Sequence, residues 1–252
     1  MRTPERRRAR VLGHPLDPLT RSEAADRVLA LTAEERPSLV VTLNPEIIVR
    51  ARSDAVLSAA IDASDLCVAD GVGVAWAAGR AGVRVPERVP GVDLVGDVLA
   101  RLGSGAPVYF LGGRPGVAER AARTATKRYG TEVAGTRDGY FGADEEPAVA
   151  AEVGASGARL LLAGLGERQE AFLHRHGERL GPVTGIGVGG TLDVLAGTVR
   201  RTPAWTRSLG VEWAWRVGLD PARWHRAPRL ARFVVLAVRA PRDDAAPPDD
   251  GA

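Results

Sequence analysis

The stretch Leu66-Cys67-Val68-Ala69-Asp70-Gly71-Val72-Gly73 is an apolar run of strand length that ends abruptly on a carboxylate and a Gly-x-Gly turn. A second apolar run, residues 39–43, ends in the same way on Asn44 and carries Thr42 near its end. In an α/β protein, chemistry gathers just beyond the carboxyl ends of the parallel strands. We therefore expect Asp70, Thr42 and Asn44 to lie together at the rim of an active site.

Strand-like and helical patterns alternate along most of the chain. The strand-like runs are residues 10–13, 39–43, 65–69, 108–111, 132–135, 159–163 and 183–187. The helical patterns are residues 20–31, 45–50, 92–102, 115–128, 145–153 and 169–176. A Thr20–Glu23 capping box opens the first helix, and Asn44 is the predicted N-cap of the second. This alternation is typical of βαβ units, so we predict an α/β fold with a Rossmann-like, mostly parallel sheet flanked by helices.

The composition is that of a globular protein with a sizeable core: 252 residues, 45% apolar, 26% charged and a net charge of +3. No apolar stretch reaches the roughly 18–20 residues of a membrane span, and the basic N-terminus lacks the apolar centre of a signal peptide. The single cysteine, Cys67, excludes an internal disulfide and a thiolate zinc cluster, and is typical of a buried strand residue. The four histidines show no metal-ligand spacing. We expect a cytoplasmic protein without a metal site.

Four segments follow from this organisation. Residues 1–9 are predicted to be a disordered basic N-terminus, 10–199 the α/β domain, 200–240 a helical appendage and 241–252 a disordered Pro/Asp-rich tail. Residues 200–242 hold ten arginines, and four of the five tryptophans follow residue 199. Arg216, Arg223 and Arg226 would share one helix face if Pro221 does not interrupt the helix. A solvated basic surface is one interpretation of this appendage. Against it, tryptophan interleaved with arginine is the composition of membrane interfaces and of nucleic-acid contacts, and we predict a membrane-proximal appendage.

Glycine-rich turns follow three of the later strand-like runs, at Gly112-Gly113, at Gly164 to Gly166, and at Gly187 to Gly190. Glycine lets the backbone approach a ligand closely, and N–H groups at a following helix start can hold a phosphate. Several such turns at equivalent strand ends favour a nucleotide-type ligand. We expect the nucleotide pocket to include Gly112, Gly113, Gly189 and Gly190. Neither a Walker loop nor the GxGxxG spacing is present.

Three further places in the sequence have competing interpretations. Gln169 opens a helix and either contacts a ligand or is a polar surface residue. Tyr140-Phe141 follows a turn and either lines a base or sugar pocket or anchors the loop in the core. Arg88 lies between Pro86 and Pro90, a placement that suits a positioned cation as well as an ion pair with Glu87 or Asp93.

Together these stretches resemble the WecG/TagA/CpsF family of bacterial glycosyltransferases, in family order over residues 10–232. The matching blocks are Thr42-Leu43-Asn44-Pro45-Glu46, Ala69-Asp70-Gly71-Val72-Gly73, Pro86-Glu87-Arg88-Val89-Pro90-Gly91-Val92-Asp93-Leu94, Phe110-Leu111-Gly112-Gly113, Gly135-Thr136-Arg137-Asp138-Gly139-Tyr140-Phe141, Gly164-Leu165-Gly166 with Gln169-Glu170, Gly187-Val188-Gly189-Gly190-Thr191-Leu192-Asp193, and Glu212-Trp213 with Arg216, Pro221 and Arg223. The chain departs from the family at Glu167-Arg168, where a Pro-Lys or Pro-Arg pair is common, and at Arg201-Thr202-Pro203, where the family has Arg-Ala-Pro.

The resemblance implies inverting, metal-independent transfer of a sugar from a UDP-sugar to a polyprenyl-diphosphate-linked acceptor at the inner membrane face. N-acetylmannosamine or a related hexose is the implied sugar, and teichoic acid or another surface polysaccharide the implied product. Asp70 is the expected general base, with Thr42 and Asn44 orienting a sugar. Arg88 and the appendage arginines are expected to stabilise the leaving diphosphate, and no cofactor is expected beyond the donor. An anionic membrane surface and a second copy of the chain are further expected partners.

Two other classes of protein are compatible with parts of this sequence. A non-enzymatic nucleotide- or RNA-binding protein would use the basic Trp/Arg tail and would show strongly salt-dependent RNA affinity. We favour the enzyme, for which no nucleic-acid partner is expected. An NAD-dependent oxidoreductase would require the dinucleotide fingerprint that the glycine turns lack.

Overall fold

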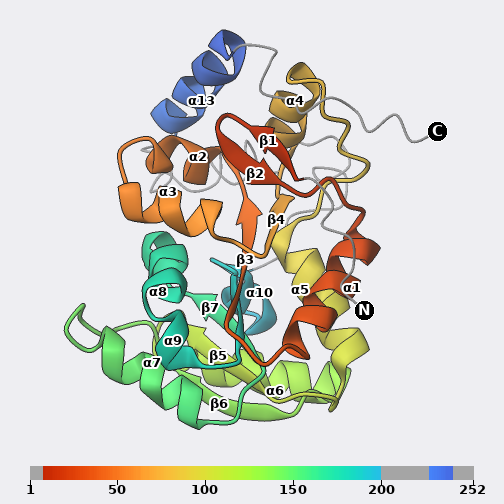
Figure 1. Ribbon diagram of the computed structural model, residues 1–252. Coiled ribbons are helices and arrows are strands. Elements are labelled where there is room, and N and C mark those ends of the chain that lie inside the picture. The colour runs from red at the N-terminus through yellow and green to blue at the C-terminus, as the bar shows by residue number, and fades with distance from the viewer. Residues whose placement is uncertain (1–7, 200–226, 241–252) are drawn as a thin grey trace.

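The computed structural model describes residues 8–199 and 227–240, which form a parallel sheet with helices on both faces (Figure 1). The sheet has six strands in the order β4-β3-β8-β7-β5-β6, and every neighbouring pair is parallel. The strands of this sheet are β3 (Ser38–Leu43), β4 (Leu66–Ala69), β5 (Val108–Gly112), β6 (Val133–Arg137), β7 (Leu160–Gly164) and β8 (Thr184–Gly187). The predicted α/β, Rossmann-like class is confirmed.

Helices connect these strands. They are α1 (Arg21–Thr32), α2 (Pro45–Ala51), α3 (Ala55–Asp62), α4 (Val72–Arg80), α5 (Gly91–Leu102), α6 (Val117–Tyr129), α7 (Glu146–Ala155), the 3₁₀ turn η1 (Gly166–Arg168), α8 (Gln169–Arg175), α9 (Gly177–Leu180), α10 (Thr191–Leu195) and α13 (Ala227–Arg239). The predicted capping box at Thr20 and Glu23 and the predicted N-cap at Asn44 are both present. The sequence pattern missed α3 and left α4 as an unassigned apolar stretch, because both are short and rich in alanine and valine.

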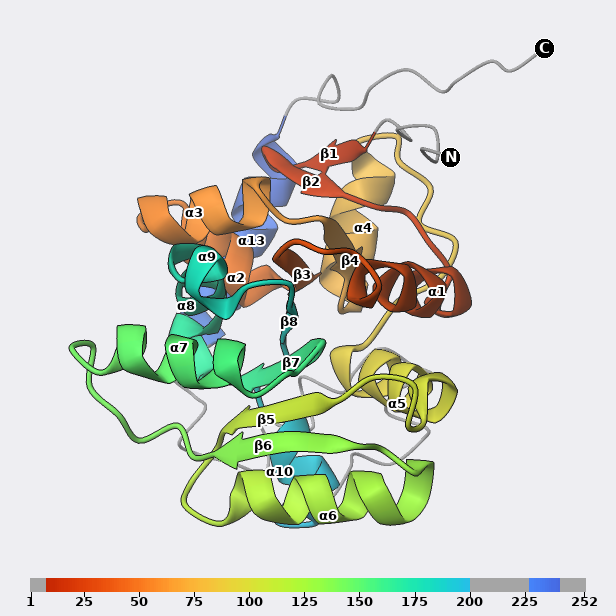
Figure 2. The same cartoon turned by 60° about the horizontal axis from the view of Figure 1, so that its bottom comes forward.

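The sheet separates two apolar cores, and alternate residues of each strand face opposite cores. Val41 of β3 packs in one core with α2, α3, α4, α7, α8 and α13, whereas Val40 packs in the other with α1, α5, α6 and α10. Figure 2 shows α6 and α10 below the β5–β6 edge, with α7 and α8 across the sheet from them. Because both faces are covered, the central strands are continuously apolar, as the sequence runs indicated.

A small hairpin precedes the sheet. Strand β1 (Ala9–Val11) pairs antiparallel with β2 (His14–Leu16). The turn places Leu12 at φ 52° and Gly13 at φ 89°, the left-handed region in which glycine is favoured. Within the segment 1–9 assigned to a disordered N-terminus, Ala9 opens β1, and Arg8 donates hydrogen bonds to Asp17 at 3.0 Å and to the Ser64 carbonyl at 2.5 Å.

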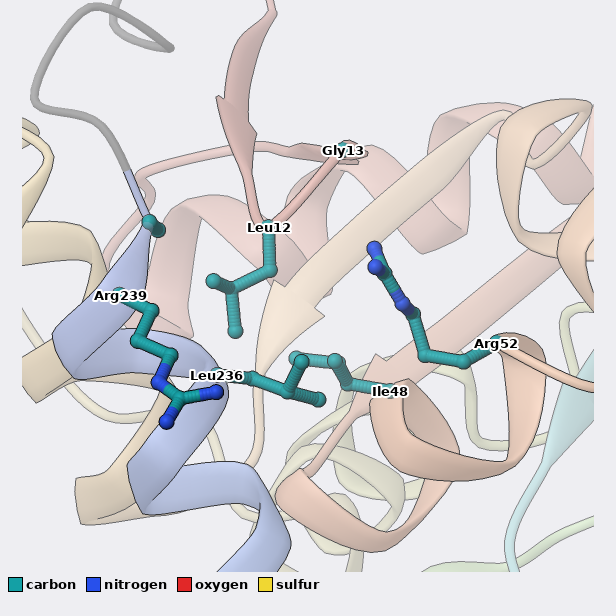
Figure 3. A pocket seen from close by; sticks show the side chains of 7 residues that line it. Leu12, Gly13, Ile48, Arg52, Leu236 and Arg239 are labelled. Atoms are coloured by element: carbon teal, nitrogen blue, oxygen red, sulfur yellow. The ribbon is translucent and has the colours of Figure 1, made fainter.

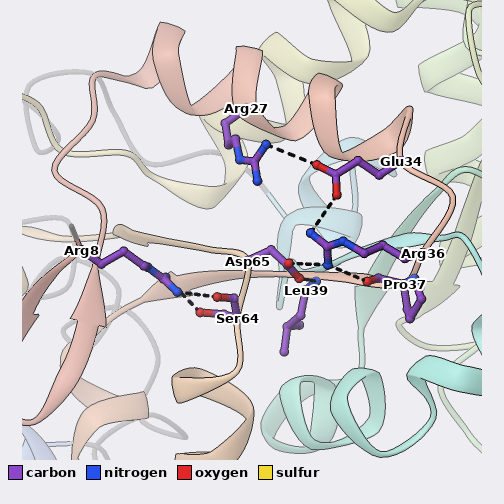
Figure 4. A network of polar contacts seen from close by, with 8 residues as sticks. All are labelled: Arg8, Arg27, Glu34, Arg36, Pro37, Leu39, Ser64 and Asp65. Atoms are coloured by element: carbon purple, nitrogen blue, oxygen red, sulfur yellow. Dashed lines mark hydrogen bonds and ion pairs between the residues drawn. The ribbon is translucent and has the colours of Figure 1, made fainter. Parts of the chain in front are cut away.

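Polar contacts join the amino ends of β3 and β4, at the edge of the sheet opposite the predicted active site (Figure 4). The Asp65 carboxylate accepts from the Leu39 backbone N–H at 2.8 Å and from Arg36 at 2.6 Å. Strand β4 begins at Leu66, one residue later than the predicted run 65–69, and the Asp65 side chain binds the amino end of β3. These contacts fix the amino ends of β3 and β4 relative to each other.

Candidate active site

The ends of β3 and β4 bring Asn44 and Asp70 together. Leu43 pairs with Ala69 in the parallel register, and the Asp70 N–H donates to the Leu43 carbonyl at 2.8 Å. Gly71 follows at φ 140°, a backbone angle that side chains rarely adopt, and turns the chain directly into α4. Asp70 thus lies at the carboxyl edge of the sheet, partly exposed, as the sequence predicted.

Arg88 reaches the same edge on a separate loop. The Val89 N–H donates to the Ala69 carbonyl at 2.9 Å, and the Val89 side chain is buried, so the proline-bounded loop is fixed against the end of β4. Glu87, one of the two ion-pair partners weighed for Arg88, accepts from the Arg21 backbone N–H at 2.9 Å at the start of α1. The loop that carries Arg88 is therefore hydrogen-bonded directly to Ala69, the residue that precedes Asp70.

Thr42 and Asn44 differ in how they could act on a ligand. Thr42 is 6% exposed, its hydroxyl lies 3.4 Å from the Gly187 carbonyl, and a Cβ on Gly91 would lie 3.4 Å from the same hydroxyl. Asn44 is half-buried, and its side-chain oxygen accepts from the Ile47 N–H at 3.0 Å as the N-cap of α2. Thr42 is therefore buried beneath the strand end, whereas the N-cap bond of Asn44 uses its side-chain oxygen and not its amide N–H₂.

Gln169 and Glu170 form a buried polar pair beside β8. Gln169 is 6% exposed: its side-chain oxygen accepts from the Gly189 N–H at 2.9 Å, and its amide nitrogen donates to Glu170 at 2.7 Å. A Cβ on Gly187 would lie 2.8 Å from both side chains. Burial raises the pKa of the Glu170 carboxyl, an effect that the hydrogen bond from Gln169 partly offsets. Gln169 thus orders the Gly187–Gly190 turn. Because it is buried, it is not the polar surface residue of the second interpretation.

The predicted glycines fall into two groups. A Cβ on Gly112 would lie 2.3 Å from the Gly164 carbonyl oxygen, and one on Gly113 would lie 2.6 Å from Val117, so packing alone requires glycine at both positions. The Gly113 N–H also donates to Gly164 at 3.1 Å. Gly189 and Gly190 instead face open space, since a Cβ added at either position would meet nothing within 4 Å. The Gly189–Gly190 turn is therefore the pair whose backbone a ligand can approach.

The two aromatic residues that follow β6, Tyr140 and Phe141, lie in different environments. Phe141 is buried, with its ring 6.2 Å from Phe172 and beneath the Arg168 guanidinium at 4.2 Å, so it anchors the loop. Tyr140 is 70% exposed, and its N–H donates to Asp138 at 2.8 Å in the turn. Only Tyr140 is positioned to meet a ligand.

Helix α13 packs on α2 and contacts α4, the helices that follow β3 and β4. Arg229 is bound at 2.6 Å by Glu46 of α2 and at 2.6 Å by Glu167 of η1, and the buried Phe233 ring packs against Gly73 of α4. The structure shows a helix over Ala227–Arg239, within the segment 200–240 that the sequence analysis predicts as a helical appendage. The candidate residues Arg216, Arg223 and Arg226 lie outside the described residues.

The sequence model of the "Glycosyl transferase WecG/TagA/CpsF family" matches residues 9–246, nearly the whole chain. The chain belongs to this family. Membership in the WecG/TagA/CpsF family confirms the resemblance, supports glycosyl transfer and does not favour the alternative of a non-enzymatic RNA-binding protein. Across the described parts of the chain, no helix has the length and apolar character required to cross a membrane.

Proposed function

We propose that this family member transfers a hexose, such as N-acetylmannosamine, from a UDP-sugar to a polyprenyl-diphosphate-linked sugar during synthesis of a surface polysaccharide or teichoic acid. The reaction proceeds with inversion and without a metal, at the inner face of the plasma membrane. The observation that supports this proposal best is the position of Asp70 at the end of β4. Its backbone N–H donates a hydrogen bond to β3, and the residue before it, Ala69, accepts one from the loop that carries Arg88.

Asp70 is the proposed general base. As the acceptor hydroxyl attacks the anomeric carbon, its proton passes to the Asp70 carboxylate, and the bond between that carbon and the β-phosphate oxygen breaks on the opposite face. UDP leaves with the bonding electron pair, and the anomeric configuration inverts. A positioned base typically contributes about 10²–10⁴-fold to such a step. Asn44, on the adjoining strand end, supplies amide N–H groups that orient a sugar hydroxyl.

The departing diphosphate needs cations. A guanidinium suits it because the planar fork donates to two phosphate oxygens at once. Arg88 is the proposed cation on the described chain, with Arg216, Arg223 and Arg226 of the appendage completing the set. The donor nucleotide is proposed to lie over the open Gly189–Gly190 turn, which Gln169 orders, with Tyr140 at its outer side and the Gly112–Gly113 turn as its neighbour.

The direct test separates donor binding from chemistry. Asp70→Asn should keep thermal protection by UDP or a UDP-sugar and reduce transfer to a lipid-linked acceptor by about 10²–10⁴-fold. Asp26→Asn, on the exposed face of α1, is the matched control and should transfer at the wild-type rate. Transfer by Asp70→Asn at more than a tenth of the wild-type rate would exclude Asp70 as the base. A wild-type protein that UDP-sugars do not protect would exclude the donor class.

A further inference from the structure

An amphipathic pocket lies between the C-terminal ends of α2 and α13 and the β1–β2 turn. Its volume is about 290 Å³, and its lining includes Leu12, Ile48 and Leu236 together with Arg52 and Arg239. Figure 3 shows the two arginine side chains on opposite sides of the pocket, with Leu12 reaching in between them. The pocket thus combines an apolar interior with cations on two sides.

Arg52 and Arg239 are both exposed, and neither makes a hydrogen bond or an ion pair with another described residue. The Asp62 carboxylate, at the end of α3, is bound by His14 of the hairpin at 3.3 Å and lies 3.9 Å from Arg10. The charged side chains that line the pocket are both arginines, which favours a ligand that carries an anion.

The pocket is distinct from the proposed active site. Helices α2 and α13 run in the same direction, because Arg229 meets Glu46 where both begin, whereas Arg52 and Arg239 line the pocket where both end. The ten residues from Arg229 to Arg239 span about 15 Å of helix. The strand ends that hold Asp70 lie toward the other end of these helices.

Beside the pocket, the described helices α13 and α4 present exposed apolar side chains. Val234, Val235 and Val238 of α13 are between 44% and 53% exposed, and Trp76 of neighbouring α4 is 42% exposed beneath the Arg80 guanidinium. Neither α4 nor α13 contains an aspartate or glutamate. An exposed apolar helix face with arginine and tryptophan, and without acids, is typical of helices that lie in a lipid headgroup layer.

We propose that the pocket binds the phosphate of an anionic phospholipid at a bilayer surface, with the Arg52 and Arg239 guanidiniums on the phosphate and Leu12, Ile48 and Leu236 against the glycerol and the first acyl carbons. The valine face of α13 and Trp76 then lie in the headgroup layer. This inference rests on the proposed function, which places the enzyme at the membrane, and assigns the lipid site that holds it there. Arginines at helix C-terminal ends also offset the helix dipole, but that role requires neither the cavity between them nor the exposed valines.

The experiment compares two charge-matched variants of the full chain. Arg52→Gln/Arg239→Gln removes both pocket cations, and Arg123→Gln/Lys127→Gln removes two exposed cations from the distant helix α6. Binding is measured by co-sedimentation with phosphatidylcholine vesicles that contain about 30% of the anionic lipid phosphatidylglycerol. Near such an anionic surface each basic residue contributes about 1 kcal/mol to binding. The pocket variant should lose about 10- to 30-fold in partition coefficient, and the α6 variant less than threefold. Equal losses in the two variants would overturn the pocket.

A soluble probe separates the lipid from a free anion. Dihexanoyl-phosphatidylglycerol, below its micellar concentration, should bind the wild type and not the pocket variant, while inorganic phosphate and dihexanoyl-phosphatidylcholine should bind at least tenfold more weakly. Phosphate binding as tightly as the lipid would show a simple anion site and overturn the proposal. Neither assay contains a sugar nucleotide, so loss of lipid binding leaves the UDP-sugar protection test intact, and a failed protection test leaves the lipid result intact.

Discussion

The side-chain oxygen of Gln169, at the start of α8, accepts a hydrogen bond from the backbone N–H of Gly189 at 2.9 Å. This bond joins the turn after β7 to the turn after β8, two neighbouring strands of the sheet. Gln169 is nearly fully buried, so the bond is protected from water. The conformation of the open Gly189–Gly190 turn therefore depends on a side chain twenty residues earlier.

Replacing Gln169 tests this link. Gln169→Ala leaves the Gly189 N–H and a Glu170 oxygen without their partners, and a buried unsatisfied group costs about 1–3 kcal/mol. We expect urea unfolding to show a loss of that size together with weaker UDP binding. A variant that loses UDP affinity at unchanged stability would instead indicate direct contact between Gln169 and the ligand.

Glu170 should make stability pH-dependent in a defined direction. Its pKa is raised by burial, so the folded chain binds more protons than the unfolded chain above the ordinary carboxyl value of 4.5. Its contribution is fully present below pH 4.5 and is lost as the pH rises through the raised value. Glu170→Gln keeps the size and the acceptor oxygen for Gln169, and should flatten that decline in urea titrations from pH 4 to 8.

The exposed Glu178→Gln on α9 is the matched control for this pH effect. A difference in unfolding free energy between wild type and Glu170→Gln that stays constant from pH 4 to 8 would contradict the raised pKa of Glu170.

Two glycine-to-alanine changes should have opposite consequences. Gly112→Ala places a Cβ 2.3 Å from a carbonyl oxygen at φ 130°, so we expect destabilisation of at least about 3 kcal/mol or insoluble protein. Gly190→Ala meets nothing within 4 Å, at φ −76°, and should fold normally. If the nucleotide approaches this turn, Gly190→Ala should reduce UDP affinity in calorimetry at unchanged melting temperature.

Arg88→Gln should impair turnover without unfolding the protein. Loss of a single positioned donor to developing charge typically reduces kcat by about 10²–10³-fold. The loop itself is held by Val89, which the substitution leaves in place. Arg84→Gln, an exposed arginine shortly before the loop, is the control and should retain full kcat. Equal rates for the two variants would remove Arg88 from the diphosphate site.

The docking of α13 should depend more on Phe233 than on Arg229. The two ion pairs of Arg229 are partly exposed and contribute about 1 kcal/mol or less each, whereas replacing a buried phenylalanine by alanine typically costs about 3–5 kcal/mol. Hydrogen exchange should therefore show lost protection across α13 in Phe233→Ala and near-normal protection in Arg229→Gln. The opposite order would show that the carboxylates, rather than the apolar contact, hold the helix.

Local patterns were sufficient for the class of fold. Apolar runs of strand length, each ending on glycine or a polar residue, indicated a buried parallel sheet, and the structure has that sheet. Short elements were missed because α3 and α4 differ little in pattern from a strand or a loop, and β2 contains a proline. Their formation depends on packing against the hairpin and α13 rather than on sequence periodicity.

The candidate site, too, could be predicted only in part from the sequence. Asp70 could be placed at the rim from the sequence alone, because a carboxylate that directly follows a buried strand emerges at the carboxyl edge of the sheet. The burial of Gln169 and Thr42, the close contact that requires Gly112, and the joining of Glu46 and Glu167 by Arg229 could not be predicted in this way. Each of these relationships joins residues far apart in the chain.

By itself, the sequence determined an α/β sheet with a carboxylate at the end of one strand, since strand length and side-chain polarity are local properties. Only the tertiary structure decided which glycines face a neighbouring backbone and which face open space, and that α13 lies along α2 with a pocket at their common end. The physical reason is that burial and hydrogen-bond pairing depend on which surfaces meet, and a residue's neighbours in sequence do not determine its neighbours in space.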